Sequence, residues 1–175
     1  MREHLINPVW KLIAANEIEV AVKLARGFED ERTVMRLQTI LQTRTSSLYV
    51  LSPIELQVVR VSAATAYLLG EGRKLERFYP PKFTWHHTLT LHAAAHNLIA
   101  AYQVQLNAAA FRSAASVASV RVTNSVDGPC EVCKLAAEGE YSPREAPSVP
   151  VTGCTNDKDG CRCALIIARI QNHLK

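Results

Sequence analysis

The chain has 175 residues, of which 48% are hydrophobic and 21% charged, and its formal net charge at neutral pH is +4. This length suits one domain or one domain with a small appendage, and this composition excludes a wholly disordered chain. The basic side chains are scattered, so the charge alone does not indicate a nucleic-acid-binding protein. No apolar run is long enough to span a membrane, and residues 1–8 lack the pattern of a secretory signal.

The first part of the chain has the apolar periodicity of α-helices. Asn7 and Pro8 resemble an N-cap followed by proline at the first helical position. Asn16 is expected to divide the region that follows into two short helices, and Gly27 to end the second.

Two further helices are predicted before residue 71. One covers residues 30–43 and turns Val34, Leu37 and Leu41 inward. The other begins at the run Ser52-Pro53-Ile54-Glu55, a capping box with proline in its favoured place, and ends at Gly70.

The longest predicted helix follows a charged connector at residues 71–83, which contains Pro80 and Pro81. Thr84 is expected to cap this helix, which reaches Ala115. Its inward stripe is predicted to consist of Leu91, Ala95, Leu98, Tyr102, Leu106 and Ala109. Many alanines on this helix favour close packing, within the chain or against a partner helix.

The pattern changes after residue 116. Residues 119–123 alternate with the period of a strand, residues 127–129 form a turn, and residues 138–160 have the prolines and glycines of a loop. The apolar run 164–168 is either a buried strand or the start of a final helix.

All five cysteines lie in this second part: Cys130, Cys133, Cys154, Cys161 and Cys163. A C-x2-C pair followed by a second cysteine group supplies enough thiolates for one tetrahedral zinc ion. The first pair suits a knuckle turn, and we expect Cys130, Cys133 and Cys154 as ligands, with Cys161 or Cys163 as the fourth. The alternatives are free buried cysteines, or two disulfides and one odd thiol. A thioredoxin-like redox role is disfavoured because no βαβ pattern surrounds Cys130.

The sequence therefore predicts a mainly α fold. Residues 1–116 form a helical body with a long central helix, and residues 117–175 form a small zinc-stapled α+β cysteine module. Metal ligation would stabilise a loop that has few apolar residues of its own.

The cysteine module resembles the C-terminal segment of Mu F-like phage head morphogenesis proteins. The likeness rests on the run 125–135, on Gly139 and the aromatic Tyr141, and on the ending Cys161-Arg162-Cys163. Glu131 stands where the family has a proline, and Cys154 stands in the region where it has a histidine. The resemblance implies a structural protein of a phage or prophage head, with Cys154 replacing the histidine as ligand.

No catalytic pattern is evident. His92 and His96 have the helical spacing of two zinc ligands, but Ala93, Ala94 and Ala95 stand between them and no glutamate base is present. Packing or surface histidines are the favoured interpretation. The phosphate-binding and nucleophile motifs of common enzymes are also missing, so we expect no enzyme and no small-molecule substrate.

Two functional hypotheses follow. The first is an assembly protein in a virion or in the cytoplasm of a bacterial host, whose partners are other protein subunits and not a membrane. The alternative is a zinc-knuckle protein that binds nucleic acid, because cationic residues such as Arg121, Lys134 and Arg169 could gather on one face of the module.

Overall fold

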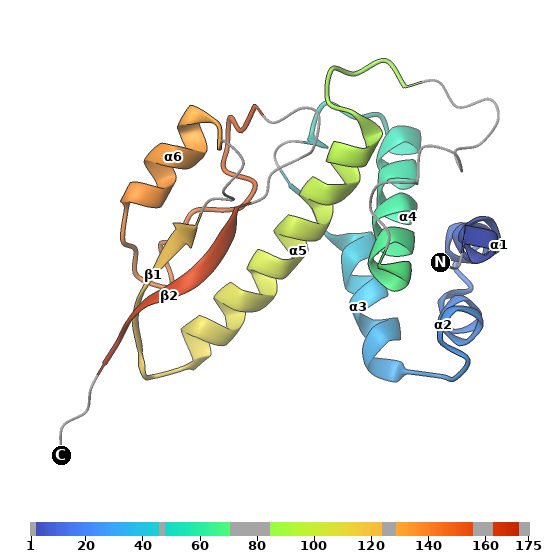
Figure 1. Ribbon diagram of the computed structural model, residues 1–175, viewed down its shortest axis with the longest axis horizontal. Helices are drawn as coiled ribbons and strands as arrows, with labels where there is room; N and C mark the ends of the chain where they lie inside the picture. Colours follow the sequence, from blue (N-terminus) through green and yellow to red (C-terminus); the bar gives the residue numbers. More distant parts are fainter. Residues whose placement is uncertain (1–2, 46–47, 71–84, 124–128, 156–162, 172–175) are drawn as a thin grey trace.

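The computed structural model describes residues 3–45, 48–70, 85–123, 129–155 and 163–171 (Figure 1). Its elements, in chain order, are α1 (Glu3–Ala14), α2 (Ile18–Arg26), α3 (Glu31–Gln42), α4 (Pro53–Leu69), α5 (Leu91–Ser113), β1 (Val117–Thr123), α6 (Glu131–Glu138) and β2 (Ala164–Ile170). The predicted fold class, mainly helical with a small sheet and the cysteines near the C-terminus, is confirmed. The predicted connector 71–83, the first two residues of the turn at 127–129, and Cys161 lie outside the described residues.

The predicted start of the first helix is wrong. Helix α1 begins at Glu3, and Pro8 lies inside it rather than at its first position. A proline there removes one backbone hydrogen bond, but Ile6, Val9 and Ile13 of the same helix are at most 1% exposed. Burial of three large apolar side chains, about 1.5–3 kcal/mol each, outweighs the local cost of the proline.

The predicted breaks and caps of the next helices are confirmed. Asn16 has a positive φ of 63° between α1 and α2, and Gly27 ends α2 in the left-handed conformation. Ser52 and Glu55 form the predicted capping box at the start of α4, and Gly70 ends that helix, again with positive φ. Each of these signals is local, so each can be recognised without knowledge of the tertiary structure.

The helical body encloses the largest of three hydrophobic clusters among the described residues. Helices α1 to α4 contribute to it, together with the N-terminal half of α5. In Figure 1, α4 stands between α5 and the pair α1–α2, and α3 lies beside α4. The most deeply buried large side chains of this cluster include Leu37, Val59 and Leu98.

Helix α5 starts later than predicted. Its N-cap is Thr90, whose hydroxyl accepts a hydrogen bond from the Ala93 amide at 3.1 Å. Residues 85–90 are not helical, because the indole of Trp85 donates to the Leu89 carbonyl at 2.6 Å and holds this segment in a turn of its own. Thr84 itself lies outside the described residues.

Four of the six residues predicted for the inward stripe of α5 are buried. Leu91, Ala95, Leu98 and Tyr102 are buried, but Leu106 is 43% exposed and Ala109 is exposed as well. The C-terminal half of α5 instead turns Ala100, Val104, Ala108 and Phe111 onto the second hydrophobic cluster. Two faces of helix α5 thus pack against two different clusters. The domain boundary predicted at residue 116 stays a prediction.

The second cluster lies beneath a two-stranded antiparallel sheet. Val120 of β1 pairs with Ile167 of β2, and Val122 pairs with Leu165. The alternative left open for residues 164–168 is therefore resolved in favour of a strand, although its pattern of burial leaves only Leu165 fully covered. On its other edge, β1 is bridged by Tyr141, and α6 lies beside the sheet (Figure 1).

Candidate metal centre

The first two cysteines lie at the start of helix α6. Cys130 is the N-cap residue, and Cys133 lies in the first helical turn. The sequence predicted a knuckle turn here, and the structure has the first turn of an α-helix instead. The amide of Lys134 donates to the Cys130 carbonyl at 3.0 Å, as the first intrahelical bond of α6. The free N–H groups of a helix N-terminus face this position and favour a negatively charged sulfur.

The third cysteine comes from the loop that follows α6. Cys154 stands directly after Gly153, whose φ of +85° turns the chain, and the Cys154 amide donates to the Val151 carbonyl at 2.9 Å. This tight turn requires the left-handed backbone that glycine adopts without strain. A Cβ atom at Gly153 would lie 3.8 Å from the Val132 side chain, so the turn packs against the first turn of α6.

The three sulfur atoms of Cys130, Cys133 and Cys154 lie within 4.8 Å of one another. The Cys130 and Cys154 sulfurs are 3.7 Å apart. Thiolates at about 2.3 Å from one tetrahedral metal ion stand about 3.8 Å apart from each other. The group can therefore hold a metal ion without a large rearrangement.

The centre is part of the second hydrophobic cluster. Cys133 is 2% exposed, while Cys130 and Cys154 are half-buried and pack against the same cluster. Val120 and Leu165 of the sheet contribute its most buried aliphatic side chains. The three cysteines are thus part of a hydrophobic core. Because Cys130 and Cys154 are only half-buried, an ion can reach the sulfurs from their side.

The thiol of Cys130 is easily deprotonated. Burial raises its pKa, but this is exceeded by the hydrogen bonds that its sulfur makes with the Thr155 and Cys133 amides and with the Cys133 and Cys154 thiols. Together they lower the pKa of Cys130 to about 7. A lowered pKa favours ligation, because the thiolate is the form of cysteine that binds a metal.

The structure brings together three of the five predicted ligands. Cys163 is 7% exposed in the same cluster, but it is not in the group of three close sulfurs. Cys161 lies outside the described residues, so the choice between Cys161 and Cys163 stays open. No disulfide joins any two of the four described cysteines.

The histidines predicted to be packing or surface residues lie in the helical body. The rings of His92 and His96 contact each other edge to face with centroids 4.4 Å apart. Among the described residues, no further Cys, Asp or Glu completes a three-ligand group with them. His87 contacts the Glu55 carboxylate at 2.9 Å, a pair that no sequence motif indicated.

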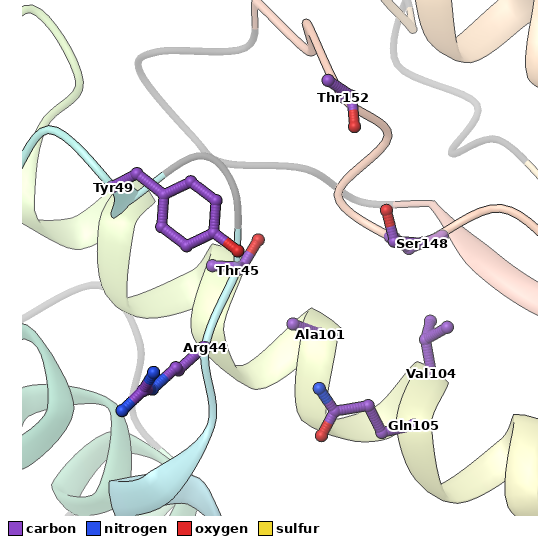
Figure 2. A pocket seen from close by; sticks show the side chains of 9 residues that line it. Arg44, Thr45, Tyr49, Ala101, Val104, Gln105, Ser148 and Thr152 are labelled. Carbon is purple, nitrogen blue, oxygen red and sulfur yellow. The ribbon is translucent and has the colours of Figure 1, made fainter.

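A hollow of about 220 Å³ lies between the helical body and the loop of the cysteine module. Figure 2 shows Ala101 and Gln105 of α5 on one side, Ser148 and Thr152 of the loop on another, and Tyr49 across from them. These residues are distant in sequence and form no pattern that could have predicted the hollow.

Comparisons of the chain with protein-family models, with curated proteins and with solved structures find no match. None of the described helices combines the length and the apolar character that crossing a membrane requires.

Proposed function

We propose that this chain is a structural protein that assembles with other protein subunits in a phage or prophage particle, and that a zinc ion stabilises its C-terminal module. The observation that carries the zinc site is the convergence of Cys130, Cys133 and Cys154 on one point. The resemblance of the module to Mu F-like head morphogenesis proteins supports the proposed role in a phage particle.

The donor set favours zinc over harder cations. Thiolates are soft ligands that select zinc, copper(I) or iron–sulfur clusters rather than magnesium or calcium. A fourth thiolate from Cys161 or Cys163 would complete a closed tetrahedral site. Such a site leaves no open position for water, so the proposed role of the metal is structural and not catalytic.

The ion would hold together segments that share few other contacts. Cys130 and Cys133 belong to the start of α6, and Cys154 belongs to the loop that follows. Of loop residues 139–155, only Val149 and Pro150 are buried. In a module with so little apolar material, the free energy of ligation becomes free energy of folding.

The sheet offers a surface for association. Ile167 and Ile170 of β2 are 40% and 61% exposed. Within the part of the chain that the structure describes, β2 pairs only with β1. An edge strand with exposed isoleucines is a site where a strand or an apolar surface of another subunit can add.

The charge of the module argues against nucleic acid as the principal partner. Lys134 lies 3.4 Å from the Glu131 carboxylate, and Arg169 lies 2.8 Å from that of Glu140. Cations that face neighbouring acids are less able to neutralise phosphates.

Sedimentation of the zinc-loaded protein tests the assembly role. We expect a defined oligomer that Ile170→Lys dissociates, whereas Leu135→Lys, at another exposed apolar position on α6, leaves it intact. A strict monomer that also fails to join particles would refute the proposal. A mobility shift with DNA or RNA that weakens steeply with salt would favour the zinc-knuckle alternative.

A further inference from the structure

Two arginines of the helical body face one shallow pocket, and no acidic residue is among the described residues that line it. The pocket has a volume of about 210 Å³ and lies between α4 and the segment that follows α3. We call it the arginine pocket. Arg44 and Arg60 supply its charge, Thr45 and Tyr49 supply hydroxyl groups, and three leucines, at positions 48, 51 and 56, supply an apolar wall.

Arg60 is the more buried of the two cations. Its Nη2 donates to the Thr43 carbonyl at 3.3 Å, which anchors the guanidinium beside the end of α3. Its Nε is buried and has no hydrogen-bond partner. Buried donors of charged groups are nearly always paired, so an unpaired one at a pocket calls for an acceptor.

Arg44 brings a second positive charge to the same place. Arg44 also lines the hollow between body and loop, and in Figure 2 its guanidinium points away from Gln105 and Ser148. Burial, followed by the charge of Arg44, lowers the pKa of Arg60 below its usual value. Among the described residues, no carboxylate forms an ion pair with either arginine.

We propose that the arginine pocket binds a small oxyanion, a carboxylate or a phosphate group, between Arg44 and Arg60. The planar guanidinium fork matches both kinds of anion and gives strong charge-assisted hydrogen bonds. The volume is below that of a pocket for a whole drug-sized molecule, so it fits one anionic group and a short tail. The leucine wall favours a carboxylate that carries a few apolar carbons.

This site does not depend on the metal centre, because every residue that lines it belongs to the helical body. Nitrogen-15 NMR of the full chain tests it through the Nε–Hε resonance of Arg60. The protein is titrated with sodium butyrate and, separately, with sodium phosphate. Sodium chloride at the same ionic strength gives the baseline for general screening.

We expect at least one anion to shift the Arg60 resonance saturably beyond the chloride baseline. Arg44→Gln, at an exposed position, should weaken this binding by about tenfold, the loss expected for one charge-assisted hydrogen bond. The matched control Arg112→Gln removes the same charge at an exposed position outside the pocket and should leave the binding unchanged.

The relative response identifies the source of the anion. Tighter binding of butyrate would assign the pocket to an organic carboxylate, and tighter binding of phosphate would assign it to a phosphate ester. Two results would overturn the proposal. One is that neither anion shifts Arg60 beyond chloride, and the other is that Arg112→Gln weakens binding as much as Arg44→Gln.

Discussion

The phenol ring of Tyr141 lies so close to Gly139 that a Cβ atom at position 139 would overlap it. The Tyr141 hydroxyl donates to the Ala136 carbonyl at 3.0 Å. The backbone of Tyr141 exchanges two hydrogen bonds of 2.8 Å with Val120. This residue therefore joins the end of α6 to β1, and it can do so only because position 139 has no side chain.

Gly139→Ala should destabilise the protein by about 1–3 kcal/mol, the usual cost of overpacking. The φ of Gly139 is −83°, so the cost comes from the contact with Tyr141 and not from backbone strain. Urea unfolding measures the change. In a Tyr141→Ala background the same substitution should cost almost nothing, and an equal cost in both backgrounds would contradict this explanation.

The capping box of α4 predicts a dependence of stability on pH. Hydrogen bonds from the Ser52 hydroxyl and amide, followed by that from His87, lower the pKa of Glu55 from 4.5 to about 2. A lowered carboxyl pKa stabilises the folded state above pH 4.5, and this contribution is lost as the pH falls toward 2. Ser52→Ala should raise the pKa of Glu55 and, as the loss of an N-cap, cost about 1 kcal/mol at neutral pH.

The pH profile separates the carboxylate from the cap itself. The difference in unfolding free energy between the wild type and Ser52→Ala should shrink as the pH falls from neutral toward 2. Thr90→Ala is the matched control, because Thr90 caps α5 with no carboxylate in its box. If both variants showed the same dependence on pH, the Glu55 contribution would be refuted.

Removal of the metal should loosen the cysteine module while leaving the helical body folded. After chelation, the amides of Val120, Val122 and Leu165 should exchange hydrogen faster, because their cluster includes the ligand cysteines. Val59 and Ala64 belong to the cluster of the helical body, and their amides should keep their protection from exchange. Uniform loss of protection in both clusters, or no change in either, would contradict a local structural role.

Substitution of single ligands separates the cysteine site from the histidine pair. Cys133→Ser should lower metal affinity by at least about tenfold, because it removes a buried thiolate at the centre of the group. The double variant with His92→Ala and His96→Ala should bind metal as the wild type does. Equilibrium dialysis against a zinc indicator measures the metal affinity of both variants. If the histidine variant lost affinity and Cys133→Ser did not, the metal site would lie on α5 instead.

Local signals in the sequence sufficed for much of the fold. The caps at Ser52 and Gly27 are set by residues within four positions, so they could be predicted without the tertiary structure. The start of α5 could not, because the hydrogen bond from Trp85 to Leu89 competes with helix formation over residues 85–90. The exposure of Leu106 also escaped prediction, since periodicity does not reveal that one helix packs against two clusters.

The candidate site was predictable in composition but not in geometry. The C-x2-C spacing indicated Cys130 and Cys133, and the second cysteine group indicated Cys154. That these cysteines begin a helix was missed, because the N-cap of α6 is a cysteine rather than Ser, Thr, Asp or Asn, and Pro129 precedes it instead of following it. The arginine pocket left no trace in the sequence, since Arg44 and Arg60 meet only through packing of α4 beside the end of α3.

Metal content and free thiols, measured together on protein purified without added metal, decide whether the cysteine group binds zinc. Mass spectrometry should find one zinc ion per chain, and one of the five thiols should remain reactive while four are protected. The metal should be lost in Cys130→Ser. A metal-free protein with five reactive thiols, or one whose thiols are paired in disulfides, would contradict the zinc-stabilised module.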